Sequence, residues 1–145
     1  MKNYLLLCGG VGGAKLALGF KNSIDPKKLT IAVNTGDDFT HYGLKICPDL
    51  DTVMYTLAGE SDTSKGWGRK DESWNMLSAL SEMGGETWFQ LGDKDLATHI
   101  QRTYLINSGL SLTEATHDLC ESFNLPHHCL LYTSDAADEK RGVDL

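Results

Sequence analysis

The sequence has 145 residues, of which 41% are hydrophobic and 23% charged, a composition typical of an ordinary globular domain. Its formal net charge of −7 argues against binding to nucleic acid or to anionic membranes, and no apolar stretch approaches the roughly 20 residues of a membrane span. The first apolar run is too short for a signal peptide, and the four cysteines lack the spacing of a zinc site or a disulfide framework, so we expect a cytoplasmic protein.

Residues 5–8 predict a buried strand, and a glycine-rich turn follows it before a helical pattern begins. Glycines at such a turn let the backbone approach a ligand, and the N–H groups at a helix start favour phosphate. The turn lacks the Gly-Lys-Ser/Thr ending of a Walker A loop and the last glycine of the dinucleotide fingerprint. The sequence therefore predicts a phosphate cradle that matches neither of these two motifs, with a plain tight turn as the alternative. The residues of this cradle are Gly9, Gly10, Gly12, Gly13 and Lys15.

A second strand is predicted over residues 29–33, which are rich in β-branched side chains. It ends at a polar turn with two adjacent carboxylates, and the residues of that turn are Asn34, Thr35, Gly36, Asp37 and Asp38. In a parallel sheet this polar turn and the glycine-rich turn lie at the same edge, where ligands bind. We therefore expect the two turns to belong to one site.

The apolar residues of the segment 50–58 recur with the period of an amphipathic helix. Asp49 is expected to cap this helix, and Asp51 is expected to stand in its first turn. Together with Asp37 and Asp38, these two carboxylates form a set able to hold a hard cation. The alternative is that all four aspartates serve only as capping and turn residues.

The rest of the chain continues the alternation of helices and strands. Trp67 stands between two glycines on a polar loop, where an aromatic side chain is either a lid or stacking surface for a ligand, or simply an anchor for the loop. His99, on a helix with a basic element, is more simply structural than catalytic. The further predicted elements are a helix over residues 73–83, a strand over 87–91, a helix over 96–108, a helix that opens with the capping box Ser111–Glu114, and a strand over 129–132.

Because strands alternate with helices and no repeat or linker interrupts them, the sequence predicts an α/β fold. We expect a Rossmann-like parallel sheet flanked by helices, with right-handed connections.

Five motifs stand in a fixed order along the chain, in residues 9–15, 33–38, 48–57, 66–68 and 91–99. Together they closely resemble the 2-phospho-L-lactate transferase family of coenzyme F420 biosynthesis, over residues 1–129. Each motif alone is weak, whereas five in order at family-like spacing are highly specific.

The resemblance implies a reaction in which a guanosine diphosphate-linked phospholactate, or its phosphoenolpyruvate or phosphoglycerate equivalent, reacts with a hydroxyl of the deazaflavin Fo. The product is the F420 precursor, GMP leaves, and Mg²⁺ is required. Asp51 corresponds to the deazaflavin contact of the family, and Gln90 stands where the family more often carries Lys or Arg.

Roles follow from the motifs and from this resemblance. The expected catalytic residues are Asp37, Asp38 and Asp51. The expected Mg²⁺ ligands are Asp37, Asp38, Asp49 and Asp51. The expected substrate-binding residues are Gly9, Gly10, Gly12, Gly13, Lys15, Asn34, Thr35, Gly36, Asp51, Gln90 and Asp93.

Members of the family are longer, so the chain is expected to be the N-terminal part of a larger fold. Residues 1–130 are the predicted Rossmann-like region that binds nucleotide and deazaflavin. Residues 131–145 depart from the family pattern and are expected not to be native coding sequence, with an authentic truncated domain as the alternative. Sequencing the gene across the codon for Leu130 decides between the two.

Two other functions remain open at this point. The chain is alternatively a non-catalytic module that binds a guanine nucleotide, or another nucleotide-phosphate enzyme on the same fold. The expected partners are small-molecule substrates, with no nucleic acid and no membrane, and a homodimer is possible. A requirement for Mg²⁺ in product formation separates the transferase from the bare binding module.

Overall fold

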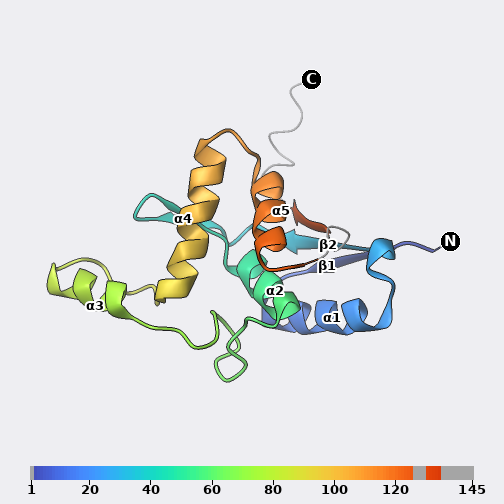
Figure 1. The fold of residues 1–145 in the computed structure, drawn as a ribbon, viewed down its shortest axis with the longest axis horizontal. Coiled ribbons are helices and arrows are strands. Elements are labelled where there is room, and N and C mark those ends of the chain that lie inside the picture. The colour runs from blue at the N-terminus through green and yellow to red at the C-terminus, as the bar shows by residue number, and fades with distance from the viewer. Residues whose placement is uncertain (1, 126–129, 135–145) are drawn as a thin grey trace.

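The computed structural model describes residues 2–125 and the backbone of residues 130–134. In these ranges strands and helices alternate as predicted for an α/β fold (Figure 1). In chain order the elements are β1 (Tyr4–Cys8), α1 (Gly10–Ser23), the 3₁₀ turn η1 (Pro26–Lys28), β2 (Leu29–Asn34), β3 (Phe39–His41), β4 (Leu44–Ile46), α2 (Pro48–Ala58), α3 (Asn75–Glu82), α4 (Asp93–Asn107), α5 (Leu112–Ser122) and β5 (Leu130–Ser134). None of the helices in the described ranges is long and apolar enough to span a membrane.

The sheet has the strand order β1-β2-β5, and both neighbouring pairs run parallel. Cys8 lies opposite Val33, so the turns after β1 and β2 leave the sheet at the same level. This arrangement confirms the predicted Rossmann-like sheet and places the two polar turns at one edge. β5 bears out the last predicted strand, apart from Cys129, which lies outside the described residues.

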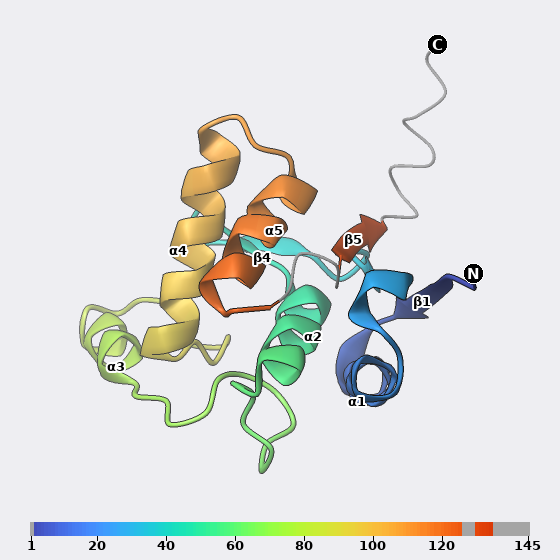
Figure 2. The same ribbon diagram turned by 45° about the vertical axis from the view of Figure 1, so that its right-hand side comes forward.

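The hydrophobic core lies between β2 and three helices, α1, α2 and α5 (Figure 2). Leu29, Ile31 and Val33 alternate along β2 and are fully buried on this side. Burial of each such side chain contributes about 1.5–3 kcal/mol to folding. The helices contribute Ala14, Ala17, Leu50, Val53, Met54, Leu57, Leu119 and Cys120 to the same cluster.

The opposite face of the sheet is open. Leu5 and Leu7 of β1 are 66% and 72% exposed, and their partners Thr30 and Ala32 on β2 are only half-buried. Paired residues of neighbouring strands share one face of a sheet, and both faces of a parallel sheet are normally covered. The described residues therefore build only one of the two expected layers.

The antiparallel hairpin β3–β4 and helix α4 form a second unit beside this core (Figure 1). The backbone N–H of Lys45 on β4 donates to Thr103 Oγ1 on α4 over 2.8 Å. Arg102 Nη1 donates to the Lys45 carbonyl over 3.3 Å. These bonds hold the inner face of α4 against the hairpin and the first turn of α2.

The prediction of a strand over residues 87–91 is wrong. This segment has no strand pairing, and its aromatic side chains pack on the hairpin instead. The ring of Phe89 meets that of Phe39 edge-on at a centroid distance of 5.2 Å, and Trp88 is 5.8 Å from the same ring. Aromatic residues favour strands because they cover a half-buried surface, and here the same residues cover a hairpin without joining it.

The glycine-rich turn also differs from the expectation. Helix α1 begins at Gly10, so most of the glycines lie in its first turn and not in a loop before it. A Cβ on Gly13 would lie 2.7 Å from Cβ of Cys8, which explains this glycine through the close packing of α1 on β1. Asp49 does not cap α2, because the N-cap residue is Cys47 and Asp49 lies inside the first turn.

Candidate active site

The turn from Gly9 to Gly13, called the glycine turn below, brings the first N–H groups of α1 to the edge of the sheet. Gly9 is the N-cap residue in an extended conformation, and no described side chain caps this helix end. A Cβ on Gly9 would lie 2.9 Å from Asp49 Oδ2, so glycine is what lets this carboxylate approach the helix start. Asp49 therefore lies in the positive field of the α1 N-terminus.

Asn34 joins the two turns of the site. Its Nδ2 donates to Asp49 Oδ2 over 3.0 Å and to Asp37 Oδ2 over 3.4 Å, and its Oδ1 accepts from the N–H of Gly36 over 3.1 Å. Two carboxylates from different elements thus converge on one amide beside the glycine turn. Asn34, Asp37 and Asp49 are called the Asn34 cluster below.

Asp38 lies apart from this cluster. Its side chain is almost fully buried, and its Oδ2 is 3.4 Å from Lys45 Nζ on β4. Burial raises the pKa of Asp38 above its ordinary value, against the opposing effects of Cys47 and Lys45. Asp38, Lys45 and the buried Thr35 line a separate polar cavity of about 530 Å³ between the hairpin and the ends of α4 and α5.

Asp51 also lies apart, on the other side of α2 from Asp49. Two positions along a helix differ by about 200° in direction, so these two carboxylates point to opposite sides. Asp49 faces the glycine turn, whereas Asp51 faces α4. The structure therefore divides the four predicted metal ligands into a pair at Asn34 and two separate aspartates.

Arg102 holds Asp51 in a buried ion pair. Arg102 Nη1 lies 3.1 Å from Asp51 Oδ2, and Nη2 donates to Oδ1, so the guanidinium binds both oxygens. The Arg102 side chain is wholly buried. Burial raises the pKa of Asp51, and the charge of Arg102 acts against that rise.

His99, Asp95 and Tyr55 continue this buried network, called the Arg102 cluster together with Asp51 and Arg102. His99 Nε2 lies 3.3 Å from Asp95 Oδ2, and the Tyr55 hydroxyl donates to Asp95 Oδ1 over 2.6 Å. Burial alone would raise the pKa of Asp95, but His99, Tyr55 and Arg102 outweigh it and hold that pKa below its ordinary value. Asp95 thus remains an acceptor at neutral pH.

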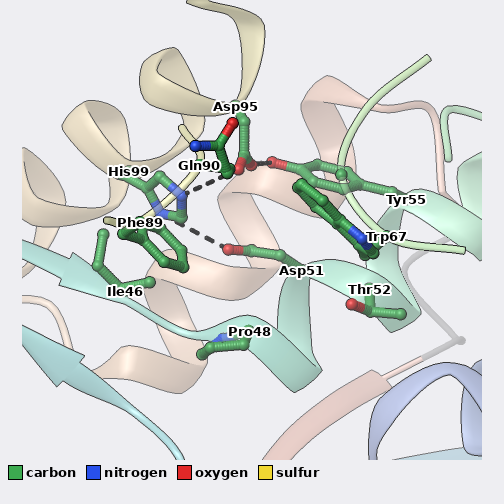
Figure 3. A pocket seen from close by; sticks show the side chains of 11 residues that line it. Ile46, Pro48, Asp51, Thr52, Tyr55, Trp67, Phe89, Gln90, Asp95 and His99 are labelled. Atoms are coloured by element: carbon green, nitrogen blue, oxygen red, sulfur yellow. Dashed lines mark hydrogen bonds and ion pairs between the residues drawn. The ribbon is translucent and has the colours of Figure 1, made fainter. Parts of the chain in front are cut away.

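A cavity of about 320 Å³ opens beside the Arg102 cluster (Figure 3). This volume is that of a small-molecule site. In Figure 3 the rings of Phe89 and Trp67 lie on opposite sides of the Asp51 carboxylate, so two aromatic side chains flank a charged group in this cavity. The lining residues are Ile46, Pro48, Asp51, Thr52, Tyr55, Trp67, Gly68, Phe89, Gln90, Asp95 and His99. This set is called the aromatic cavity below.

Trp67 reaches the cavity from the polar loop after α2. Lys65 lies over the Trp67 ring at 5.4 Å and over the Trp74 ring at 4.6 Å, and Arg69 of the same loop binds Glu60 at 3.2 Å. Trp67 remains 43% exposed although its loop is held. Of the two interpretations of this residue, the cavity favours a stacking surface.

The remaining predicted residues have different surroundings. Gln90 lines the aromatic cavity. Asp93 lies outside it and accepts hydrogen bonds from Ser73, Asn75 and Met76 at the start of α3. Lys15 is exposed in the second turn of α1, on the helix whose start forms the glycine turn.

Carboxylate donors for a cation occur in two places. In the Asn34 cluster, the exposed Asp37 and the half-buried Asp49 lie beside a helix start, which suits Mg²⁺ shared between one or two carboxylates and a phosphate. Asp51, Asp95 and His99 also offer ligand atoms within 4.8 Å of one another. Arg102 already occupies both oxygens of Asp51, so this second group fits a cation poorly.

Sequence reasoning did not assign Tyr55, Asp95 or Arg102 to the site. A usable signal is present, because Asp95, His99 and Arg102 stand at i, i+4 and i+7 on one face of α4. A charged stripe on the buried face of a helix requires a partner, and Asp51 is that partner.

Comparison with known proteins shows the family of the chain. The profile of the family described as 2-phospho-L-lactate transferase CofD matches residues 5–140. The chain is 47% identical over 131 residues to a phosphoenolpyruvate transferase of Kitasatospora aureofaciens, covering 89% of this chain and 40% of that protein.

Two further relatives carry the same name. A phosphoenolpyruvate transferase of Streptomyces coelicolor is 42% identical over 142 residues, covering 97% of this chain and 44% of the relative. One of Mycolicibacterium smegmatis is 44% identical over 148 residues, covering 95% of this chain and 45% of the relative. The chain spans less than half the length of these curated relatives.

Proposed function

The chain belongs to the 2-phospho-L-lactate transferase CofD family, and from this membership we propose that the protein it represents is a transferase of coenzyme F420 biosynthesis. In the proposed reaction, a phosphorylated three-carbon acid moves from a guanosine diphosphate-linked donor to a hydroxyl of the deazaflavin Fo. The acid is phosphoenolpyruvate, 2-phospholactate or phosphoglycerate. The observation that supports this reaction best is the position of α2, whose first turn separates a phosphate-type site from an aromatic cavity.

The aromatic cavity is the proposed site of the acceptor ring. Its walls include Trp67 and Phe89, which suit a flat conjugated ligand, and Asp51 and Gln90 supply polar contacts at its edge. In the Arg102 cluster two carboxylates face one guanidinium and one imidazole, so its charge does not attract phosphate. A neutral ring is therefore favoured here over the anionic donor.

The glycine turn is the proposed site of the donor's diphosphate. The N–H groups of the first turn of α1 and the side chain of Lys15 supply the positive field that phosphate needs. A Cβ at Gly12 would meet nothing within 4 Å, so space for a ligand remains over this turn.

Mg²⁺ is the proposed cofactor, held by Asp37 and Asp49 of the Asn34 cluster. When bound, it would supply positive charge against the phosphate oxygens in the transition state. Asn34 Nδ2 donates to one oxygen of each carboxylate and so holds them near each other, with Asp49 beside the glycine turn.

The proposed chemistry is one phosphoryl transfer. The acceptor hydroxyl oxygen forms a bond to the phosphorus that carries the three-carbon acid, the bond from that phosphorus to the GMP oxygen breaks, and the hydroxyl proton passes to a carboxylate base. Asp51 orients the acceptor within the cavity, and the first turn of α2 sets the distance between the hydroxyl and the phosphate.

The decisive experiment is a mass-spectrometric assay for the F420 precursor with Fo, Mg²⁺ and the activated donor. It is carried out on this chain and on a version extended to the length of its relatives. We expect product only in the presence of Mg²⁺, and removal of the metal by a chelator should abolish it.

Binding of a guanine nucleotide without product in either protein would favour the non-catalytic module. Turnover of a different nucleotide-linked phosphate, with Fo ignored, would favour another enzyme on the same fold.

A further inference from the structure

Arg102 is the most completely enclosed charge in the described part of the chain, and it touches three elements. Its guanidinium binds both oxygens of Asp51 on α2, the carbonyl of Lys45 on β4, and Nδ1 of His99 on its own helix, the last over 3.2 Å. Its contacts reach two side chains that line the aromatic cavity, Asp51 and His99.

The contact between Arg102 and His99 determines where the imidazole carries its proton. A guanidinium only donates hydrogen bonds, so Nδ1 of His99 must accept, and the ring proton therefore belongs on Nε2. This nitrogen faces Asp95 Oδ2 at 3.3 Å. The other arrangement would set an N–H of His99 against an N–H of Arg102, with Asp51 Oδ2 too distant at 3.6 Å to compensate.

We propose that Arg102 is the positioning residue of the aromatic cavity. It orients the Asp51 carboxylate through both oxygens, and it fixes His99 in the Nε2–H form, which turns this N–H toward Asp95 at 3.3 Å. The cavity thus presents donors and acceptors in one arrangement before a ligand enters. Preorganisation of this kind raises affinity because less ordering remains for the binding step.

The substitution Arg102→Lys tests this role, because lysine keeps the positive charge beside Asp51 and loses the planar fork. Arg69→Lys is the matched control: Arg69 also pairs with one carboxylate, Glu60, and stacks on Tyr55, but among the described residues its side chain contacts neither Asp51 nor His99. The double variant Asp51→Asn/Arg102→Met removes both buried charges together. It replaces Arg102→Lys in the test if that single variant does not fold.

The first measurement is nitrogen-15 NMR of the histidine rings, which needs no ligand. In the wild-type chain we expect His99 to show an unprotonated Nδ1 and a protonated Nε2. Arg102→Lys, or the double variant, should shift both signals toward the average of two tautomers, and Arg69→Lys should leave them in place. A protonated Nδ1 in the wild type, or an unchanged tautomer in the variants, overturns the proposal.

The second measurement rests on the proposed function and compares two ligands. Arg102→Lys should weaken binding of free Fo about tenfold, the loss of one hydrogen bond to a charged group, while guanosine diphosphate affinity stays constant. Equal affinity for Fo in a folded Arg102→Lys chain would overturn the positioning role. If wild-type chain binds no Fo at all, the acceptor assignment fails, and the NMR result still decides the role of Arg102.

Discussion

Asp49 and Asp51 show how strongly the surroundings of a carboxylate depend on its direction from a helix. Asp49 lies beside a helix start and the Asn34 amide, whereas Asp51 is buried against Arg102. The two residues are alike in the sequence, and only the packing of α2 between α1 and α4 distinguishes them. Substitution of Asp49 is therefore expected to impair metal binding, whereas substitution of Asp51 is expected to reduce the stability of the fold.

Asp37→Asn and Asp49→Asn should abolish Mg²⁺-dependent turnover in the extended protein with little change in melting temperature, because both side chains are proposed metal ligands. Asp38→Asn should act more mildly on turnover.

Asp51→Asn should instead lower the free energy of unfolding by about 3–5 kcal/mol, since it leaves Arg102 buried without its carboxylate. Calorimetric Mg²⁺ titration and thermal melts separate these outcomes. If all four substitutions had equal and small effects, the metal-site prediction would be wrong, and the aspartates would serve only as capping and turn residues.

Gly12 provides a direct test of the phosphate cradle. A Cβ at this position would meet no protein atom within 4 Å, so Gly12→Val should fold normally and yet fill the space proposed for phosphate. We expect a loss of guanosine diphosphate affinity by calorimetry. Gly19→Val is the matched control, because Gly19 is also in α1 with open space around it and lies far from the helix start. Unchanged affinity in Gly12→Val, or the same loss in Gly19→Val, would refute the cradle.

At the scale of elements, hydrophobic period and local capping predicted most of the fold. The capping box Ser111–Glu114 forms as expected, with both reciprocal hydrogen bonds, and the helices of the segments 50–58 and 73–83 are present. These features depend on residues within a few positions of one another, which is why a sequence reveals them.

Other features depend on contacts between distant segments and could not be predicted in this way. The segment 87–91 has strand-forming residues, but its partner is a hairpin some 45 positions away in the chain, which it covers through side chains (Phe89 on Phe39). In the same way, only the approach of α4 to α2 shows that Asp51 pairs with Arg102. The edge of the sheet was predicted correctly, whereas the aromatic cavity required the three-dimensional arrangement.

Asp93 connects two elements, and this connection predicts a pH dependence. Hydrogen bonds from Met76, Ser73 and Asn75 lower the pKa of Asp93 to about 2. A carboxyl whose pKa is lowered by folding stabilises the fold above its unfolded pKa, 3.8, and this stabilisation disappears as the pH falls through about 2.

Asp93→Asn should therefore melt at a lower temperature than wild type by a constant margin above about pH 4, and the margin should vanish near pH 2. Thermal melts of both chains across this range measure it. Glu82→Gln is the control, because Glu82 is also a carboxylate of α3 but makes no side-chain hydrogen bond or ion pair with the described residues, so this variant should show no such convergence. A margin that stays constant down to pH 2 would contradict the role of Asp93 at the start of α3.

At the scale of the whole molecule, the open face of the sheet is the main departure from a complete domain. Helices cover one face, and the exposed leucines of β1 mark the other. β1 is also an edge strand among the described strands, with free backbone groups along its outer side. Apolar faces and free edges of this kind recruit other chains.

We therefore expect the 145-residue chain to self-associate and to be inactive in the transfer assay. Charge repulsion from −7 opposes association only in part, because salt screens exposed charges beyond about 10 Å. Leu5→Thr with Leu7→Thr should reduce association in light scattering, since threonine keeps the strand and removes apolar surface. Leu16→Gln, which removes an exposed leucine from α1, should not. A monodisperse wild-type monomer with a sharp melt would show that this segment is a complete domain.

Because of its position, Trp67 can report ligand binding in the cavity through its own fluorescence. The chain has three tryptophans, and among them only Trp67 lines the aromatic cavity in the described structure. Trp74 and Trp88 stand outside the cavity, so their emission supplies the background. A conjugated ring that stacks on Trp67 quenches that one indole. Cavity occupancy can accordingly be followed by intrinsic fluorescence in the unlabelled chain, with Trp67→Phe as the silent reference.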